Sequence, residues 1–307
     1  MSKVAYIFPG QGSQYVGMGK DLYEASPIAR ELFDRTDKIL GISLSKICFE
    51  EPKDELRQTK NTQPAIFVHS IVLTRMMERN NDAQMAAGHS LGEYSALFFA
   101  GAMEFDDALR LVRLRGELMQ RAGEEQKGTM AAIVGLDHDT LIGICREASA
   151  EGIVQCANFN SPGQIVISGS LSGVRKAMEM AKLRGAKFVK ELVVSGAFHS
   201  PLMQSARDGL KSALADANIM DAHIPVYANV NARPVQKAGE IRTLLEEQLT
   251  NAVRWEESIK RMIEDGATKF TEIGPAKVLQ GLVKRIDPSV GINGIDKAAD
   301  ITLSVPV

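Results

Sequence analysis

Residues 84–92 read QMAAGHSLG, a short apolar segment that runs into a serine flanked by glycines. The last five residues match the pattern Gly-x-Ser-x-Gly, and a helix-forming stretch follows from Glu93. In this context the pattern is typical of a nucleophile elbow, a strained strand-to-helix turn that exposes a serine hydroxyl. We therefore expect Ser90 to be a nucleophile and the backbone N–H of Leu91 to be an oxyanion donor at the positive end of the helix dipole. The same bare pattern also occurs in tight turns that carry no chemistry.

The order of strand, turn and helix recurs on both sides of the elbow, which predicts an α/β fold with a parallel sheet. Residues 4–8 form an apolar run, and residues 64–78 have helical spacing with Pro64 placed as a first-turn residue. Further helices are expected at residues 20–40, 93–103, 105–122, 201–217, 239–249, 255–265 and 278–286, and further strands at 224–230 and 269–273. We expect residues 1–126 and 197–307 to form one large catalytic subdomain, similar to an α/β-hydrolase.

Residues 127–196 follow a different order. The expected elements are strand 129–136, helix 137–149, strands 153–158 and 164–168, helix 171–184 and strand 187–194. This β-α-β-β-α-β order is the split βαβ motif of ferredoxin-like units, and Asp137 is available as a helix cap. We predict a small ferredoxin-like subdomain inserted into the large one, so that Ser90 lies before the insertion and His199 just after it.

The composition is typical of a globular protein, with 45% hydrophobic and 24% charged residues among 307. The formal charge of -2 argues against a polycationic nucleic-acid-binding protein. No apolar run approaches the ~20 residues that span a bilayer, and we expect no signal peptide at residues 1–10. Cys48, Cys145 and Cys156 form no Cys-x-x-Cys pair, so we expect free thiols and a cytoplasmic location.

Two nucleotide-binding patterns near the N-terminus fail. A dinucleotide fingerprint that starts at Gly10 and Gly12 would need a third glycine at position 15, which is Tyr15. A P-loop that ends at Lys20 would need a glycine at position 14, which is Gln14. No histidine or carboxylate cluster has metal-ligand spacing. We therefore expect neither a metal nor another cofactor.

A serine nucleophile requires a general base, and the chain has five histidines. His199 lies between a predicted strand and a predicted helix, where loops commonly carry catalytic groups. His69 belongs to an apolar helix as a half-buried residue, and His223 introduces a strand. His138 begins a helix among aspartates and should be solvated, and the side chain of His89 should point away from the elbow tip. The residues alone favour His199 without excluding the other four.

The chain resembles the malonyl-CoA:acyl carrier protein transacylases and the acyltransferase domains of polyketide synthases from residue 1 to about residue 287. The motifs that carry the resemblance occur in order and with matching spacing. They are FPGQGSQ (8–14), TQPA (62–65), GHSLGEY (88–94), RLRG (113–116), NFNSPGQ (158–164), GAFHSPLM (196–203), NAVRW (251–255) and EIGP (272–275). Two positions depart from the common pattern, since many relatives have proline in place of Ala252 and others have glutamine in place of Arg254.

The resemblance implies a Ser90–His199 dyad in which a main-chain carbonyl, that of Gln248, orients the histidine in place of an aspartate. It also implies that the N–H groups of Gln11 and Leu91 form the oxyanion hole. The implied reaction is a ping-pong transfer, because the acyl group is held covalently between two half-reactions. Malonyl would pass from malonyl-CoA to an ester on the serine and then to the phosphopantetheine thiol of acyl carrier protein.

The resemblance further implies that Arg115 binds the free carboxylate of the malonyl group. A fixed guanidinium makes two parallel hydrogen bonds to a carboxylate, and an uncharged acyl group would leave that cation unpaired in a partly dry pocket. Without the resemblance, Arg115 would be interpreted as an exposed helix charge. Phe198 would crowd an α-methyl substituent, which disfavours methylmalonyl, and Asn160 would contribute to substrate binding.

Acyl carrier proteins are acidic, so we expect a basic surface to receive one, with Lys277, Lys284 and Arg285 as candidates; a solvated helix face explains them equally well. We expect a monomer that binds neither nucleic acid nor membrane, with its site in a cleft beside the insertion. Three alternatives compete: a serine hydrolase or thioesterase, a discrete acyltransferase of polyketide synthesis, and a non-catalytic protein that docks carrier protein. Both fatty acid and polyketide carriers fit the motifs, and residues 293–307 carry no family motif.

Overall fold

The structure is a computed structural model that describes residues 2–50, 53–77 and 82–303. Within these ranges, six strands form a main sheet in the order β10-β9-β1-β2-β7-β8. Their bounds are β1 Lys3–Phe8, β2 Met85–Gly88, β7 Val226–Tyr227, β8 Pro234–Val235, β9 Ala267–Ile273 and β10 Gly291–Ile295. Neighbouring strands from β10 to β7 are parallel, and the β7–β8 pair is antiparallel. The predicted α/β fold with a parallel sheet is confirmed.

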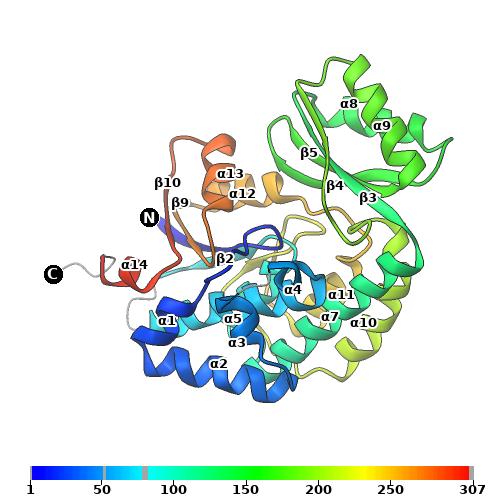
Figure 1. The fold of residues 1–307 in the computed structure, drawn as a ribbon. Helices are drawn as coiled ribbons and strands as arrows, with labels where there is room; N and C mark the ends of the chain where they lie inside the picture. Colours follow the sequence, from blue (N-terminus) through cyan, green and yellow to red (C-terminus); the bar gives the residue numbers. More distant parts are fainter. Residues whose placement is uncertain (1, 51–52, 78–81, 304–307) are drawn as a thin grey trace.

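Helices lie on both sides of the main sheet, some directly against its strands and others against the helices that cover it (Figure 1). They are α1 Lys20–Ala25, α2 Pro27–Leu40, α3 Leu44–Phe49, α4 Lys53–Arg57, α5 Thr59–Met76, α6 Gly92–Phe99, α7 Phe105–Glu125, α10 Gln204–Asp216, α11 Ala238–Glu247, α12 Trp255–Glu264, α13 Val278–Ile286 and α14 Ala298–Leu303. Successive side chains of a strand point to opposite faces. Tyr6 and Phe8 of β1 therefore pack with α5, α6 and α7, while Ala5 and Ile7 pack with α12 and α13.

Helix α5 begins at Thr59, so Pro64 lies inside the helix and the prediction of a first-turn proline is wrong. A proline inside a helix offers no N–H to the carbonyl four residues earlier, which here belongs to Lys60. Arg113 of α7 donates a hydrogen bond from Nη1 to this oxygen over 2.9 Å. A side chain from another helix thus replaces the missing donor, which sequence spacing does not reveal.

Two of the other boundary differences occur at prolines. The helical stretch expected at 20–40 is two helices, because Ser26 is extended and Pro27 starts α2 at a position where proline is favoured. The helix expected at 201–217 begins with a short 3-10 segment, Pro201–Met203, that leads into α10. Neither difference affects a predicted site residue, since His199 still lies in the loop before Pro201 and no predicted site residue lies in 20–40.

The C-terminal segment forms regular structure although residues 293–307 carry no family motif. Strand β10 pairs with β9 at the sheet edge, and α14 follows. Between them, the carboxylate of Asp296 accepts hydrogen bonds from the Tyr15 hydroxyl over 2.9 Å and from the Ala276 N–H over 3.1 Å, and it lies 3.0 Å from His69 Nε2. These contacts attach the C-terminal segment to the loop after β1, to helix α5 and to the loop after β9.

Four antiparallel strands between residues 128 and 191 form a second sheet, drawn in green to one side of the main sheet in Figure 1. Its elements are β3 Gly128–Val134, α8 His138–Ala148, β4 Val154–Ser161, β5 Gln164–Ser170, α9 Leu171–Leu183 and β6 Phe188–Glu191. Their order is that of a ferredoxin-like unit, and they share a separate apolar core. Asp137 caps α8 by accepting a hydrogen bond from the Thr140 N–H over 2.8 Å. We propose that residues 127–196 are the inserted subdomain and that 1–126 with 197–307 form the large one.

All three cysteines are free and buried. Folding brings two of them together, because the Sγ atoms of Cys145 on α8 and Cys156 on β4 are 4.0 Å apart. Both belong to the core of the second sheet. Among the described residues, none of the helices combines the length and apolar character needed to cross a membrane.

Candidate active site

Ser90 lies in the turn between β2 and α6, where the Gly-x-Ser-x-Gly pattern places it. Its φ is 53°, in the left-handed region that residues other than glycine adopt only with strain. The flanking glycines are required for space. A Cβ on Gly88 would lie 1.8 Å from the carbonyl carbon of Gly92, and a Cβ on Gly92 would lie 2.0 Å from the carbonyl oxygen of Phe8. The turn therefore packs directly against β1 and holds the serine in one orientation.

Asn229, two residues after β7, braces this turn from the adjacent strand. Its Nδ2 donates to the carbonyl oxygen of Gly88 over 2.7 Å, and its Oδ1 accepts from the N–H of Ser90 over 2.7 Å. Both bonds are made to backbone groups of the elbow, and Asn229 is fully buried. Asn229 was not predicted as a site residue, and its position just after a strand is the one local signal that could have indicated it.

His199 is the histidine that contacts the serine. Its Nε2 lies 2.8 Å from Ser90 Oγ, although the two residues are 109 positions apart in the chain. Its Nδ1 lies 2.9 Å from the main-chain oxygen of Gln248, directly after α11. A carbonyl oxygen can only accept, so Nδ1 donates and the Nε2 of the neutral ring accepts the serine hydroxyl proton. Gln155 of β4 donates from Nε2 to the His199 carbonyl over 2.8 Å and ties this loop to the second sheet.

Burial lowers the pKa of His199 from 6.5 to about 3, the positive charge of Arg115 acts in the same direction, and the hydrogen bond with the Gln248 carbonyl acts against both. The imidazole is therefore uncharged at neutral pH. A general base must be in this state before it takes a proton.

The low pKa of His199 predicts a specific sensitivity of the fold to acid. Because its folded pKa lies below 6.5, the unfolded chain binds the proton first, so this stabilisation is complete above pH 6.5 and is lost as the pH falls toward 3. Replacing His199 by glutamine removes the titration. When the pH is lowered from about 7.5 to about 5, we expect the unfolding free energy to fall by about 2 kcal/mol less in the variant than in the wild type, as measured by urea unfolding.

Glu93 titrates in the same pH range, but its effect on the unfolding free energy has the opposite sign. Burial raises its pKa to about 7, so the protonated carboxyl stabilises the fold at low pH and this stabilisation is lost as the pH rises. Glu93 is present in both proteins, so its effect cancels in the comparison. Equal losses of unfolding free energy in the wild type and in His199→Gln would contradict the prediction.

Arg115, on α7, is fully buried beside the nucleophile, so the exposed position that the residues alone favoured is wrong. Its Nη2 donates to Ser90 Oγ over 3.0 Å and to Gln248 Oε1 over 2.7 Å, and its Nη1 donates to Gln63 Oε1 over 2.7 Å. The guanidinium also lies 5.6 Å from the ring centre of Tyr94. In the described parts of the chain, no carboxylate forms an ion pair with it and its Nε has no hydrogen-bond partner. A buried cation in this state favours an incoming anion.

These groups open into a cavity of about 220 Å³ between the main sheet and the second sheet. The lining includes four further residues that the resemblance implied, namely Gln11, Leu91, Asn160 and Phe198. Within the described ranges, the N–H groups of Gln11 and Leu91 donate to no backbone oxygen, so both can bind an oxyanion. Most of the remaining wall is apolar: Met119, Met130, Val166, Leu192, Val194, Val278, Leu279 and Leu282.

His89 also lines this cavity, but its ring contacts other residues than the serine. Its Nε2 lies 2.9 Å from Asn160 Oδ1, and its ring centre lies 5.6 Å from that of Trp255. Burial lowers the pKa of His89, which favours the neutral ring. His89 therefore orients Asn160 in the wall of the cavity rather than contacting the serine.

The other histidines make contacts elsewhere. His69 is completely buried against Asp296 and is not half-buried as expected. His138 lies 3.1 Å from Glu256 across the junction with α12, so it is not simply solvated. The backbone N–H of His223 donates to the Ala100 carbonyl oxygen. No group of three or more His, Cys, Asp or Glu side chains in the described residues could hold a metal ion.

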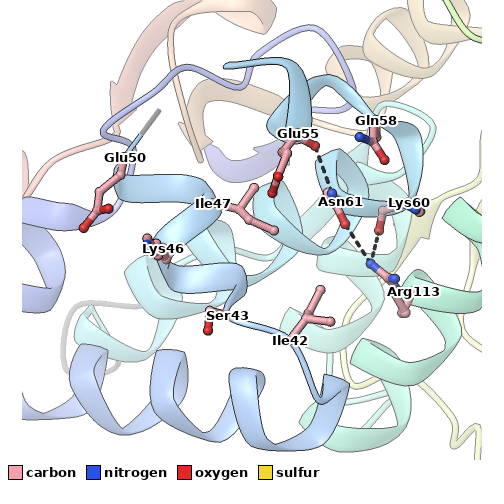
Figure 2. Close-up of a pocket in the computed structure, with 10 residues that line it drawn as sticks. All are labelled: Ile42, Ser43, Lys46, Ile47, Glu50, Glu55, Gln58, Lys60, Asn61 and Arg113. Carbon is pink, nitrogen blue, oxygen red and sulfur yellow. Dashed lines mark hydrogen bonds between the residues drawn. The ribbon is translucent and has the colours of Figure 1, made fainter. Parts of the chain in front are cut away.

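A larger cavity of about 610 Å³ lies beside α3, α4 and the start of α5 (Figure 2). Arg113 is held there by the Lys60 carbonyl oxygen and by Asn61 Oδ1, both at 2.9 Å. The lining combines three basic with two acidic side chains. Neither Ser90 nor His199 belongs to it, so the smaller cavity is the candidate active site.

Glu93 and Gln63 are two further residues of the site that the sequence analysis did not assign. Glu93 accepts a hydrogen bond from Gln248 Nε2 over 2.8 Å, and Gln63 holds Arg115. Burial raises the pKa of Glu93 to about 7, against the hydrogen bonds from Gln248 and from the Asn229 N–H and the charge of Arg115. Gln63 belongs to the TQPA motif and Glu93 to the GHSLGEY motif. Each is a charged or amide side chain next to an apolar segment, and this is the sequence feature that could have indicated a role in the site.

A model of the acyl transferase domain family matches residues 5–297. The malonyl CoA-acyl carrier protein transacylase of Bacillus subtilis is 48% identical over 307 residues, which cover 99% of this chain and 97% of the relative. The acyl-carrier-protein-S-malonyltransferase of Bartonella henselae aligns with a TM-score of 0.95 at 42% identity over 98% of each chain. A malonyl-transacylase solved in complex with its type II PKS acyl-carrier protein aligns with a TM-score of 0.95 at 40% identity over 99% of each chain.

Proposed function

The chain belongs to the acyl transferase domain family, and on that premise we propose that it transfers malonyl from malonyl-CoA to the phosphopantetheine thiol of acyl carrier protein. One arrangement carries the proposal. The buried guanidinium of Arg115 lies 3.0 Å from Ser90 Oγ, which lies 2.8 Å from His199 Nε2. A fixed cation beside a serine nucleophile favours an acyl group that has a carboxylate of its own.

We assign the first half-reaction to Ser90 and His199. His199 Nε2 takes the hydroxyl proton as Ser90 Oγ attacks the thioester carbonyl of malonyl-CoA. The carbonyl of Gln248 keeps the proton on Nδ1 and stabilises the imidazolium that forms. The C–S bond then breaks, CoA leaves as a thiol with the proton from Nε2, and malonyl remains as an ester on the serine.

The N–H groups of Gln11 and Leu91 are assigned to the oxyanion of the tetrahedral intermediate. The N–H of Leu91 points from the start of α6, where the helix dipole also favours negative charge. A donor of this kind is typically worth ~2.7–4 kcal/mol of transition-state stabilisation. Preorganised backbone donors suit the task because they do not reorient when the charge develops.

The malonyl carboxylate has two effects when it binds Arg115. It selects malonyl over acetyl, because an acetyl group would leave the buried cation unpaired. It also neutralises a charge that lowers the pKa of His199, so the correct substrate makes this histidine a stronger base. Phe198 is assigned to the exclusion of α-methyl substituents and Asn160 to substrate binding.

In the second half-reaction, the thiol of the carrier's phosphopantetheine attacks the serine ester, and His199 Nε2 takes the thiol proton. The bond between Ser90 Oγ and the acyl carbon then breaks, Ser90 Oγ recovers the proton from Nε2, and malonyl leaves as a thioester of the carrier. The apolar walls of the cavity disfavour water as a competing nucleophile. We place the carrier near Lys277, Lys284 and Arg285 at the exposed surface of α13. Two of these cations already have partners, since Lys284 donates to the Val290 carbonyl and Arg285 donates to Gln164.

The alternatives make different use of the site. A serine hydrolase or thioesterase of acyl thioesters would need the same dyad but would have no role for Arg115. A discrete acyltransferase of polyketide synthesis would use all of these residues with a different carrier. We assign the protein to fatty acid synthesis, and we propose that it acts as a monomer.

Intact-mass analysis tests the proposed function. After mixing the chain with malonyl-CoA, we expect one malonyl adduct, located at Ser90 by peptide mapping, that disappears when phosphopantetheinylated acyl carrier protein is added. A matched sample with acetyl-CoA should give far less adduct. Release of free malonate without an adduct would favour a hydrolase, and no reaction at all would favour a docking protein.

A further inference from the structure

Glu93 is a buried carboxylate that the dyad mechanism does not use. It lies at the second position of α6, with 2% of its surface exposed, and it does not line the cavity that Ser90 opens into. Its Oε2 accepts hydrogen bonds from Gln248 Nε2 over 2.8 Å and from the Asn229 N–H over 3.1 Å. A buried carboxylate requires such partners, and one of these two leads directly to the acyl-binding arginine.

The side chain of Gln248 connects Glu93 to Arg115. Its Nε2 donates to Glu93 Oε2 and, over 3.1 Å, to the Ser90 carbonyl, while its Oε1 accepts from Arg115 Nη2 over 2.7 Å. The two ends of an amide are similar in size but opposite in hydrogen-bonding character. In the reversed orientation, the amide NH₂ would face the N–H groups of the guanidinium, donor against donor. The acceptors on the far side of the amide therefore determine which end faces Arg115, and the shorter of the two bonds is the one to Glu93, at 2.8 Å against 3.1 Å for the Ser90 carbonyl.

The distance of Glu93 from Arg115 also matters for the substrate. A carboxylate in direct contact with the guanidinium would occupy the donors that the malonyl carboxylate needs. Separated from it by one amide, Glu93 offsets part of the buried positive charge and leaves donor capacity free, including the Nε of Arg115, which has no partner among the described residues. The arrangement orients the arginine without filling its anion site.

We propose that Glu93 is a positioning residue for malonyl selection, which acts by holding the Gln248 amide in the orientation whose oxygen accepts a hydrogen bond from Arg115. This inference rests on the proposed function, because malonyl selection is its specificity. Glu93 contacts no reacting atom, and the main-chain carbonyl of Gln248, which orients His199, is a separate group from the side-chain amide.

The test compares Glu93→Ala with Glu93→Gln in a competition between malonyl-CoA and acetyl-CoA, read by intact mass. In Glu93→Ala, the amide loses an acceptor, and we expect the ratio of malonyl to acetyl adduct to fall about tenfold or more. In Glu93→Gln, the new amide oxygen can accept from the same two donors. We expect this variant to keep the ratio within about threefold of the wild type.

A merely structural role for Glu93 predicts a different result, in which both adducts fall together and the ratio stays constant. A wild-type ratio in Glu93→Ala would overturn the proposal, and so would an equal loss of ratio in Glu93→Gln, because the charge and not the acceptor would then be responsible. If Glu93→Ala does not fold, Gln248→Met keeps the main-chain carbonyl and removes the amide. It should show the same loss of ratio, and an unchanged ratio would again overturn the proposal.

The wild type in the same competition separates this inference from the proposed function. A wild-type chain that fails to acquire malonyl would refute the proposed function. If the wild type prefers malonyl and the Glu93→Ala variant has the same preference, the role of Glu93 would be refuted and the proposed function would stand.

Discussion

Replacing Ser90 by alanine is expected to abolish the malonyl adduct and to lower malonyl transfer to carrier protein by about four orders of magnitude or more. The lost Oγ is the atom 2.8 Å from His199 Nε2 and 3.0 Å from Arg115 Nη2. Alanine, like serine, carries a Cβ, so the strained backbone at φ 53° changes little. The variant should therefore remain folded, as thermal unfolding can verify, while its chemistry is lost.

Ser95→Ala is the matched control for this variant. Ser95 lies on α6, one turn further along, and is fully buried, with no partner for its hydroxyl among the described residues. We expect normal loading of this control by intact mass and normal transfer in the carrier assay. Normal turnover of Ser90→Ala, or a malonyl adduct elsewhere in the chain, would refute the nucleophile assignment.

Replacing Arg115 by alanine is expected to remove the preference for malonyl, with malonyl loading reduced about a hundredfold or more. The substrate carboxylate would enter a buried site without its cation. Acetyl loading should fall much less or rise, because the penalty of leaving a buried guanidinium unpaired disappears with the arginine. Arg115→Lys should be intermediate, since an ammonium group supplies charge without the planar pair of donors.

The measurement for Arg115→Ala is the competition between malonyl-CoA and acetyl-CoA, with kcat/KM determined for each. Arg110→Ala is the matched control, because Arg110 is an exposed residue of the same helix. The control should retain the wild-type preference. Unchanged selectivity in Arg115→Ala would refute the role of this residue as a carboxylate clamp.

Prediction from sequence succeeded where the determining interactions are local. The elbow at 88–92 could be predicted because Ser90 needs glycine on both sides. A Cβ at either position would clash with backbone atoms of the turn or of the adjoining strand β1. The cap of α8 by Asp137 is likewise an interaction within one helical turn. Motif order then extended the assignment to Gln11, His199, Gln248 and Arg115, which the structure brings to Ser90 or to the lining of its cavity.

Other features could not be predicted because their partners lie far away in the chain. Pro64 is tolerated inside α5 because Arg113 supplies a donor to the freed Lys60 oxygen. The edge strand β10 has no motif of its own and is stabilised by pairing with β9 and by the contacts of Asp296. In each case, the compensating group belongs to another element, and periodicity or spacing carries no information about it.

The sequence by itself determined the α/β class, the strained serine turn and the order of family motifs, since these depend on residue size, backbone conformation and short-range spacing. Only the tertiary structure decided that Asn229 braces the serine turn, that Arg115 is buried without a carboxylate partner in the described residues, and that Glu93 reaches it through Gln248. The physical reason is that protonation, charge and hydrogen bonding around Ser90 depend on burial and on groups up to 158 positions away in the chain, which only packing brings together.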